Sequence, residues 1–451
     1  MVGGDNPLAG RLLAAADALV ADSGSYNGNP DARALLRYLD YQDTDATVRA
    51  ARARLLRAAA RLRALFLLPA PDAPGLVFVG GEADPGCLGA GFTALPVGSL
   101  AGSGLTPQRA FESCVGEGIE YLSQFAQDGD AIETGTMLER CGRLHDHGGR
   151  FIAAVLTACD VDGERPIGWV RFRRLPAGPE EWFPADICLR RSMAQRDFTA
   201  PLKLSTGCAA GTTRDDAALR ALLELIERDA AALWWRGGRR GRAIAPESEA
   251  GKAAAALLEI LRQGNQGRFT RLLDITTDLG IPVIAAVSAR VDGCGFTFGL
   301  AARITPADAA RAAIIEMCQG ELAHHVVAAK RHESGDAALN ESDRRRLRHG
   351  ELIDMRHCPL LQPLGDSDLA PSPRAVDAAT ALHDVLARLG EHGIDTYLLD
   401  LTRPQFEVPV VRALAPGLQI EPGTIVSDRL ARAIAETGGG SVHTAGLPLL
   451  L

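Results

Sequence analysis

Hydrophobic and polar residues alternate along this chain in two rhythms, one typical of helices and the other of strands. Alanine, leucine and arginine recur at helical spacing over residues 8–67, and a similar pattern covers residues 375–392. Short apolar or β-branched runs predict strands at residues 76–79, 152–156, 167–171, 269–274, 282–287, 295–299, 395–400 and 408–412. Residues 335–375 are polar and rich in proline, which predicts an irregular segment. Strand clusters that alternate with single long helices indicate an α+β fold.

The N-terminal part carries only the helical pattern. It ends in the stiff sequence Pro-Ala-Pro-Asp-Ala-Pro at residues 69–74, which predicts a helical extension and linker (residues 1–74) before a main domain (residues 75–451). The extension is dense in alanine and arginine. This composition favours packing against the main domain over contact with nucleic acid.

Three stretches of the chain share one polar pattern, which indicates internal pseudo-repeats. Each has a threonine, then an alanine four residues on, then a glutamate seven further, then a glutamate or glutamine three beyond it. The residues are Thr106, Ala110, Glu117 and Glu120; Thr213, Ala217, Glu224 and Glu227; Thr305, Ala309, Glu316 and Gln319. The spacing of the last two positions places both on one face of a helix. The alternative is three unrelated amphipathic helices with chance glutamate pairs.

Local chemistry predicts where these three helices begin. The three threonines are suitable N-caps, because their hydroxyls accept hydrogen bonds from otherwise unpaired N–H groups. Pro107 and Pro306 stand at the first helical position, where the missing N–H of proline costs nothing. Asp216 and Asp308 come three residues after their caps, close to a capping-box arrangement. Glycines precede the first two helices, and such turns let a phosphate approach backbone N–H groups.

The acidic positions of the repeats lie in apolar surroundings, as in Leu-Leu-Glu-Leu-Ile-Glu at residues 222–227. Five carboxylates and an amide near an apolar interior would repel one another and are costly to bury without partners. A hard cation removes this cost. Carboxylate oxygens suit magnesium, which usually binds together with phosphate. The pattern therefore predicts a nucleotide site built from three helices.

Charge and composition exclude several classes of protein. The net charge of −8 argues against a nucleic-acid partner held by a general basic surface. Only three lysines occur, so phosphate contacts must depend on arginine, hydroxyl groups and the backbone. The chain has no Gly-x-x-x-x-Gly-Lys-Ser/Thr loop of the kind that cradles nucleotide phosphates. The first residues lack a secretory pattern and no apolar run is long enough to span a membrane, which predicts a cytoplasmic protein.

Other chemically notable residues have plainer interpretations. The nine cysteines form no CxxC pair, and Cys114, Cys208 and Cys318 are expected to be buried small hydrophobes. The tryptophan pair at residues 234–235 fits either a substrate platform or an anchor in the core. His324 follows the third repeat and is expected to be a satisfied helix histidine.

Together these motifs resemble the YcaO family over about residues 95–420. The resemblance rests on Ser-Thr-Gly-Cys-Ala-Ala-Gly-Thr-Thr-Arg-Asp-Asp-Ala at 205–217 with Glu-Leu-Ile-Glu-Arg-Asp-Ala at 224–230, and on the matching segments at 104–120, 316–319 and 400–412. It implies a fold of its own that binds ATP with magnesium ions. It also implies phosphorylation of a peptide-bond oxygen, after which loss of phosphate gives an azoline, a thioamide or an amidine.

The resemblance implies roles for individual residues. Those expected to bind magnesium are Glu117, Glu120, Glu224, Glu227 and Glu316. Those expected to contact nucleotide or phosphate are Ser113, Ser205, Thr212, Asp216, Arg228 and Gln319. Thr212 stands where the family often has asparagine, Asp216 where it has glutamate, and Glu321 where some members have arginine. The lysine and arginine that some members place near the N-terminus for phosphate have no clear match.

The reaction type is left open by the C-terminus. Azoline-forming members often end in alternating prolines, whereas this chain has a single one, Pro448. We expect cyclodehydration of Cys, Ser or Thr in a ribosomally made precursor peptide. The alternatives are thioamide formation with a sulfur-delivering partner, and an accessory role in ribosomal-protein methylthiolation. The extension lacks the strands of a winged-helix peptide clamp, so we expect a separate partner, E1-like or of the sulfur-transfer type, to bind the leader peptide. The predicted partners include a second copy of this chain, as a homodimer.

Overall fold

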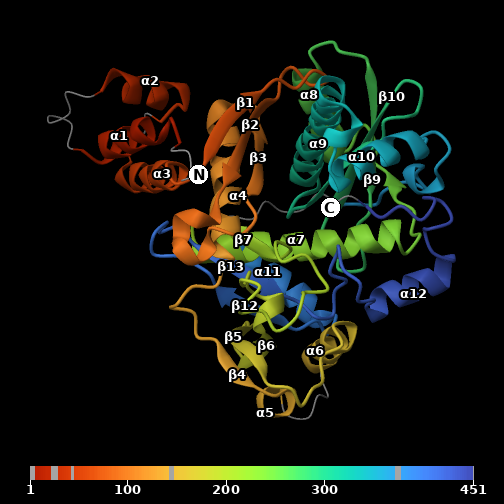
Figure 1. Ribbon diagram of the computed structural model, residues 1–451. Helices are drawn as coiled ribbons and strands as arrows, with labels where there is room; N and C mark the ends of the chain where they lie inside the picture. The colour runs from red at the N-terminus through yellow and green to blue at the C-terminus, as the bar shows by residue number, and fades with distance from the viewer. Residues whose placement is uncertain (1–5, 22–28, 42–44, 142–146, 371–376, 450–451) are drawn as a thin grey trace.

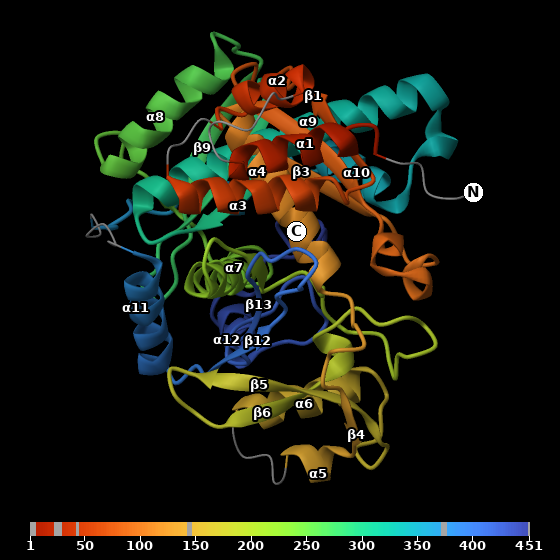
Figure 2. The same cartoon turned by 90° about the vertical axis from the view of Figure 1, so that its left-hand side faces the viewer.

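The computed structural model describes residues 6–21, 29–41, 45–141, 147–370 and 377–449, which form a mixed helix-and-sheet fold (Figures 1 and 2). The α-helices are α1 (Ala9–Val20), α2 (Pro30–Tyr38), α3 (Ala46–Ala59), α4 (Pro107–Ser123), α5 (Met137–Cys141), α6 (His147–Ala158), α7 (Arg214–Trp235), α8 (Glu249–Arg262), α9 (Pro306–Ser334), α10 (Glu341–Leu352), α11 (Ala378–Glu391) and α12 (Asp428–Thr437).

The strands are grouped into three antiparallel sheets. They are β1 (Ala64–Leu68), β2 (Val77–Ala83), β3 (Gly98–Gly104), β4 (Glu133–Gly135), β5 (Ile167–Leu175), β6 (Glu180–Pro184), β7 (Cys208–Ala210), β8 (Arg242–Ala243), β9 (Arg268–Asp274), β10 (Val283–Arg290), β11 (Thr297–Ala302), β12 (Thr396–Asp400) and β13 (Val410–Leu414). The sheet orders are β1-β2-β3, β11-β10-β9-β8 and β4-β5-β12-β13-β7, with β6 paired to β5. Three edge strands, β3, β7 and β11, therefore each end a sheet.

Each of these edge strands is followed by one of the long helices that the repeats predict. Helix α4 packs on β2 and β3, α9 packs on β10 and β11, and α7 packs on β13 and β7. Figure 1 shows α7 crossing the middle of the molecule, with the β1–β3 and β8–β11 sheets above it and the third sheet below. The expected pseudo-repeats are thus three strand–helix units arranged around one centre.

The threonine caps begin these helices as the sequence predicts. The side chains of Thr106, Thr213 and Thr305 accept hydrogen bonds from the N–H groups of Arg109, Asp216 and Asp308. Pro107 and Pro306 occupy the first helical positions of α4 and α9. Local sequence therefore fixes the start of each helix, and the acidic pairs follow at a constant distance along it.

The predicted helical pattern over residues 8–67 is wrong at its C-terminal end. Residues 64–68 form β1, which pairs with β2 from Ala64 opposite Glu82 to Leu68 opposite Phe78. A run of alanine and leucine suits a helix locally, but pairing with β2 satisfies the backbone of the segment and overrides that preference. The helices of the extension, α1 to α3, precede this strand, and α3 packs on α4 (Figure 2).

Two further predictions are wrong. Residues 152–156 belong to α6 and not to a strand; Ile152, Val155 and Leu156 are buried at helical spacing. Within the supposedly irregular segment at 335–375, α10 begins with a capping box formed by Asn340 and Asp343. Its charged sequence gives no apolar stripe, so the cap is the only local sign of a helix.

Candidate functional site

The first glutamate of each repeat helix is bound to the edge strand that precedes it. A carboxylate oxygen accepts a hydrogen bond from a backbone N–H at, or next to, that strand. The three bonds join Glu117 to Ala101 N–H at 2.6 Å, Glu224 to Gly207 N–H at 3.0 Å, and Glu316 to Leu300 N–H at 3.0 Å. Unpaired N–H groups of three sheet edges are satisfied in this way.

The second acidic position of each helix reaches the next edge strand around the centre. Glu120 accepts from Ala210 N–H at 2.7 Å, Glu227 accepts from Ala302 N–H at 3.2 Å, and the Gln319 amide donates to Ser103 Oγ at 2.7 Å. Helix α4 is thereby linked to β7, α7 to β11 and α9 back to β3, which closes a circle. We call Glu117, Glu120, Glu224, Glu227, Glu316 and Gln319 the acid ring.

Glycines allow the helices to approach the strands this closely. A Cβ on Gly102 would lie 2.1 Å from the carbonyl oxygen of Ala110 on α4. A Cβ on Gly299 would lie 2.2 Å from the backbone of Ala313 and Met317 on α9. Any larger residue would separate helix from strand, so the glutamates on that helix could no longer reach the strand N–H groups.

Burial makes the charged form of the ring costly in this protein. It raises the pKa of Glu120 and of Glu227 to about 8, and raises the pKa of Glu117 and Glu316 as well. Repulsion from neighbouring carboxylates, with Glu224 common to all four, adds to the effect. These like charges are therefore held together without enough positive charge to balance them.

Arg228 is the main positive charge inside the ring. Its guanidinium lies 3.3 Å from Glu224 and 3.7 Å from Glu227. Its Nε and Nη1 atoms are nevertheless buried without a hydrogen-bond partner among the described residues. A buried guanidinium with unsatisfied donors beside a group of carboxylates fits an anion bound together with cations.

Two basic residues at the site were not predicted from the sequence. Burial lowers the pKa of the Lys203 ammonium group. The nearby carboxylates of Glu224 and Glu117 oppose this shift. Arg303 lies close enough to lower the pKa of Glu227 and Glu316. Both residues precede a repeat helix, Lys203 in the loop before β7 and Arg303 directly after β11. That position was the only available signal in the sequence.

The residues predicted to contact nucleotide lie in different parts of the site. Thr212 donates from N–H and Oγ1 to Asp216, which also accepts from Arg220 at 2.9 Å, so these three form one polar group at the N-terminus of α7. Ser113 is exposed one turn before Glu117 on α4, and Ser205 precedes Gly207 by two residues. Within the described residues neither serine hydroxyl makes a hydrogen bond.

The donor set of the ring suits magnesium in particular. No group of three or more His, Cys, Asp or Glu side chains in the described ranges converges tightly enough to enclose a metal by itself. Magnesium does not require this, because it is usually bound by one or two carboxylates together with phosphate oxygens and water. Spaced carboxylates around a guanidinium with unbonded nitrogens therefore fit magnesium held with phosphate, and fit a closed protein-only cage poorly.

The alternative candidates belong to the core. Trp234 and Trp235 are buried and donate to the carbonyl oxygens of Leu360 and Leu447, which identifies the pair as anchors. The predicted buried cysteines, Cys114, Cys208 and Cys318, are indeed buried, and burial raises the pKa of each thiol to about 12. Across the described ranges, no helix is both long and apolar enough to cross a membrane.

The protein is similar to two uncharacterised proteins. One, from Methanothermobacter thermautotrophicus, is 25% identical over 336 residues, which cover 72% of this chain and 82% of that protein. The other, from Rhizobium leguminosarum bv. trifolii, is described as lying in the tfuA 3′ region. It is 29% identical over 286 residues, 58% of this chain and 64% of its own length.

Solved structures share the fold. A heterocyclase in complex with substrate and cofactor matches with a TM-score of 0.67 and 22% identity, over 87% of this chain and 55% of that one. YcaO from Methanopyrus kandleri, bound with AMPPCP and Mg2+, matches with a TM-score of 0.58 and 19% identity, over 83% of this chain and 90% of that one. A chain of the E. coli microcin synthetase McbBCD complex with pro-MccB17 bound matches with a TM-score of 0.58 and 15% identity, over 78% of this chain and 88% of that one.

A family model supplies the broader assignment. The model described as YcaO cyclodehydratase, ATP- and Mg2+-binding, matches residues 101–419, which include β7, β11, the second part of β3 and all three repeat helices. ATP and Mg2+ are accordingly the cofactors associated with this fold. The chain belongs to the YcaO family.

Proposed function

We propose that this protein uses ATP and Mg2+ to phosphorylate the oxygen of a backbone amide in a ribosomally made precursor peptide, converting Cys, Ser or Thr residues to azolines. The acid ring is the observation that carries the proposal. It combines carboxylates of raised pKa with the unsatisfied donors of Arg228, an arrangement that suits magnesium and phosphate together. The family assignment supports the same cofactors.

Roles follow from position and charge. Glu117, Glu120, Glu224, Glu227 and Glu316 would hold magnesium. Each of the five uses one oxygen for a backbone N–H at or next to an edge strand, and Glu224 also pairs with Arg228. Arg228 and Lys203 would face the phosphates. Thr212 and Asp216, at the start of α7, would contact the nucleoside, and Ser113, Ser205 and Gln319 would complete the polar lining. When bound, magnesium and ATP supply a transferable phosphoryl group and neutralise its charge.

The chemistry needs activation because amide oxygen is a poor leaving group. The side-chain sulfur or oxygen of Cys, Ser or Thr adds to the preceding carbonyl carbon, and the former carbonyl oxygen takes the phosphoryl group. Expulsion of that oxygen as phosphate, with loss of the amide proton, leaves the C=N bond of an azoline. The protein contributes positioning, exclusion of water, and positive charge from Arg228 and Lys203 beside the developing negative charge.

A titration calorimetry experiment tests the nucleotide part first. ATP is titrated into the full chain with magnesium and, separately, with EDTA. We expect binding that requires magnesium. Absence of binding under both conditions would contradict the proposal and favour the accessory role in methylthiolation.

Mass spectrometry then tests the reaction with a candidate precursor rich in Cys, Ser and Thr, encoded near this gene. Loss of one water per modified residue identifies an azoline. Heavy-oxygen label in the reacting amide must appear in the released phosphate. An intact peptide, in the presence of bound ATP and its leader-binding partner, would rule out cyclodehydration.

Thioamide formation is the second candidate, because the C-terminus lacks the proline alternation of azoline-forming members. The tail instead packs on the core: the Leu447 carbonyl accepts from Trp235 and Leu449 is buried. In the same experiment, exchange of oxygen for sulfur in the presence of a sulfur donor identifies this reaction.

Partners are part of the proposal. The microcin synthetase match is a complex with a pro-peptide bound, which supports a peptide substrate and a separate, E1-like or sulfur-transfer, partner for this chain. A homodimer, a cytoplasmic location and the lack of a nucleic-acid partner remain parts of the same proposal.

A further inference from the structure

A cavity of about 470 Å3 lies between the β1–β3 sheet on one side and helices α9 and α10 on the other. It is distinct from the polar group of Thr212 and Asp216 at the start of α7, neither of which lines it. Its volume falls in the range of roughly 300–1,000 Å3 that pockets for small molecules and cofactors occupy. The cavity is therefore large enough for a segment of a substrate.

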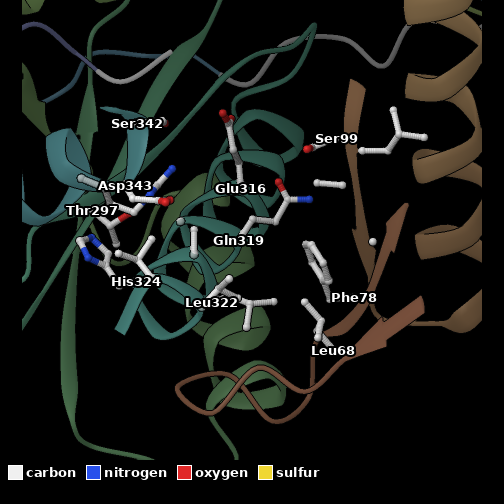
Figure 3. A pocket seen from close by; sticks show the side chains of 18 of the residues that line it. Leu68, Phe78, Ser99, Thr297, Glu316, Gln319, Leu322, His324, Ser342 and Asp343 are labelled. Carbon is white, nitrogen blue, oxygen red and sulfur yellow. The ribbon is translucent and has the colours of Figure 1, made fainter. Parts of the chain in front are cut away.

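The two walls of the cavity differ in chemistry, as Figure 3 shows. The sheet side presents Phe66, Leu68 and Phe78, and Leu322 and Val327 of α9 continue the apolar surface. The opposite wall is polar. Its polar side chains are those of Thr297, His324, Ser342, Asp343, Arg346 and His349, and Phe296 and Phe298 also line the cavity. Phe66 and Val326 are each 44% exposed, so the cavity opens to solvent.

The cavity is continuous with the acid ring. Glu316 and Gln319 belong to the ring and also line the cavity, where Figure 3 shows them at the upper end near Ser99. Ala101, whose N–H bonds Glu117, lines it too. An occupant of the cavity therefore lies directly against the groups that would hold magnesium and phosphate.

The polar wall includes a buried side chain, His349, whose hydrogen-bonding groups are unused among the described residues. Its side chain is 2% exposed, yet neither ring nitrogen has a hydrogen-bond partner among the described residues. The neighbouring His324 is satisfied, because its Nε2 lies 3.1 Å from the Phe296 carbonyl oxygen. A buried imidazole with two unused nitrogens beside an open cavity is what a site for a ligand with its own donors and acceptors provides.

We propose that this cavity is the substrate subsite that accepts an apolar, preferably aromatic, side chain flanking the amide to be modified, with the peptide backbone bonding to the wall of His349. The proposal rests on the proposed function and names the part of the substrate that determines specificity. The occupant must reach the acid ring from outside, because Glu316 and Gln319 line the cavity. It must be largely apolar, because one wall of the cavity is apolar. The nucleoside of ATP is the competing occupant. The residues that we propose as nucleoside contacts, Thr212 and Asp216, do not line the cavity, which argues against it.

Binding of short peptides to the full chain, saturated with AMPPCP and Mg2+, tests the inference. The probes are acetylated, amidated tripeptides, Phe-Cys-Gly and Ala-Cys-Gly, and affinity is measured by calorimetry. We expect the phenylalanyl peptide to bind at least tenfold more tightly. Equal affinities, or no peptide binding, would overturn the proposal.

Variants locate the binding. Ala323→Phe fills the cavity from α9 and should weaken the phenylalanyl peptide at least tenfold, while AMPPCP–Mg2+ affinity is unchanged. Val326→Arg, at the exposed mouth, should act in the same direction without entering the core. Ala329→Phe, on the same helix but outside the lining, is the matched control and should change nothing.

The outcomes separate this inference from the proposed function. If Ala323→Phe abolishes nucleotide binding, the cavity holds the nucleoside and the inference is wrong while the function stands. If the parent chain does not bind AMPPCP–Mg2+ at all, the proposed function fails and the inference fails with it. Normal nucleotide affinity with no peptide discrimination overturns the inference alone.

Discussion

Two clusters of charged side chains include residues of α9 and are built on opposite principles. The acid ring includes Glu316, one oxygen of which accepts from Leu300 N–H, and the ring leaves donors of Arg228 unsatisfied. Barely more than one turn further along, the Glu321 cluster joins Glu321 to Arg262 and Arg268. There both carboxylate oxygens accept from Arg262 at 2.5 and 2.7 Å, and Arg268 and Ser288 donate at 3.0 and 2.5 Å.

The difference separates structural charge from charge arranged for a ligand. In the Glu321 cluster the carboxylate of Glu321 bonds to both guanidinium groups, and Asp72 lies 3.7 Å from Arg268 as a second counter-charge. The desolvated charges are therefore paired within the protein, as a buried ion pair requires. In the acid ring carboxylates outnumber the cations near them, and burial raises their pKa. The first cluster fastens α8 and β9 to α9. The second is the one that we propose to be completed by cations and an anion.

Glu321→Gln should have the largest effect, on stability. It leaves two buried guanidinium groups without their carboxylate, which costs about 3–5 kcal/mol of unfolding free energy. Urea denaturation measures this directly. The exposed Glu259→Gln on α8 is the control. A change below about 1 kcal/mol would mean that the Glu321 cluster is not structural.

His349, which lines the cavity beside the acid ring, should make the unfolding free energy depend on pH. Burial, then repulsion from Arg346, lowers its pKa to about 4, whereas in the unfolded chain it is near 6.5. Between these values the unfolded state binds the extra proton, so the contribution of His349 to the unfolding free energy is largest above about pH 6.5 and falls as the pH drops towards 4, by on the order of 1–3 kcal/mol. The raised pKa values of Glu120 and Glu227 contribute in the opposite direction.

Urea midpoints at about pH 5 and about pH 7 check this expectation. His324, with its pKa also lowered to about 4, contributes in the same direction as His349. On going from pH 7 to pH 5, His349→Phe should therefore lose less stability than the parent chain, or gain more, because the destabilising protonation of His349 in the unfolded state is absent. An unchanged slope in that variant would show that His349 is not the titrating group.

Glu224→Gln should act on the ligand and spare the fold. The amide oxygen can still accept from Gly207 N–H, while one charge leaves the ring, so stability without magnesium stays equal or rises. Magnesium-dependent ATP affinity should fall at least tenfold, about 1.4 kcal/mol. Calorimetry measures it, again with Glu259→Gln as control. Unaltered ATP binding would mean that the acid ring is not the nucleotide site.

Gln319→Glu should have the smallest effect. It gives α9 the same acidic pair as α4 and α7, and the new carboxylate can accept from Ser103, so the ring stays closed. We expect magnesium-dependent ATP affinity to change by no more than about threefold, roughly 0.6 kcal/mol. A much larger loss would show that the amide of Gln319 has a role that a carboxylate cannot fill.

The local features of the site were predictable from the sequence because they depend on residues close in the chain. Thr213 as a cap, Pro306 at the first helical position and the spacing of Glu224 and Glu227 are all properties of one helix. The failures have the opposite character. Residues 64–68 became a strand because β2 lies beside them, and Lys203 joined the site because the fold brings it close to Glu224 and Glu117.

The sequence by itself therefore determined that three capped helices exist and that each bears its acidic pair on one face. Only the tertiary structure decided that Glu120 would meet β7, Glu227 would meet β11 and Gln319 would return to β3. It also decided that a cavity would open beside Glu316. The physical reason is that caps and helical spacing arise from neighbouring backbone groups, whereas the closure of a ring and the shape of a cavity depend on contacts between segments hundreds of residues apart.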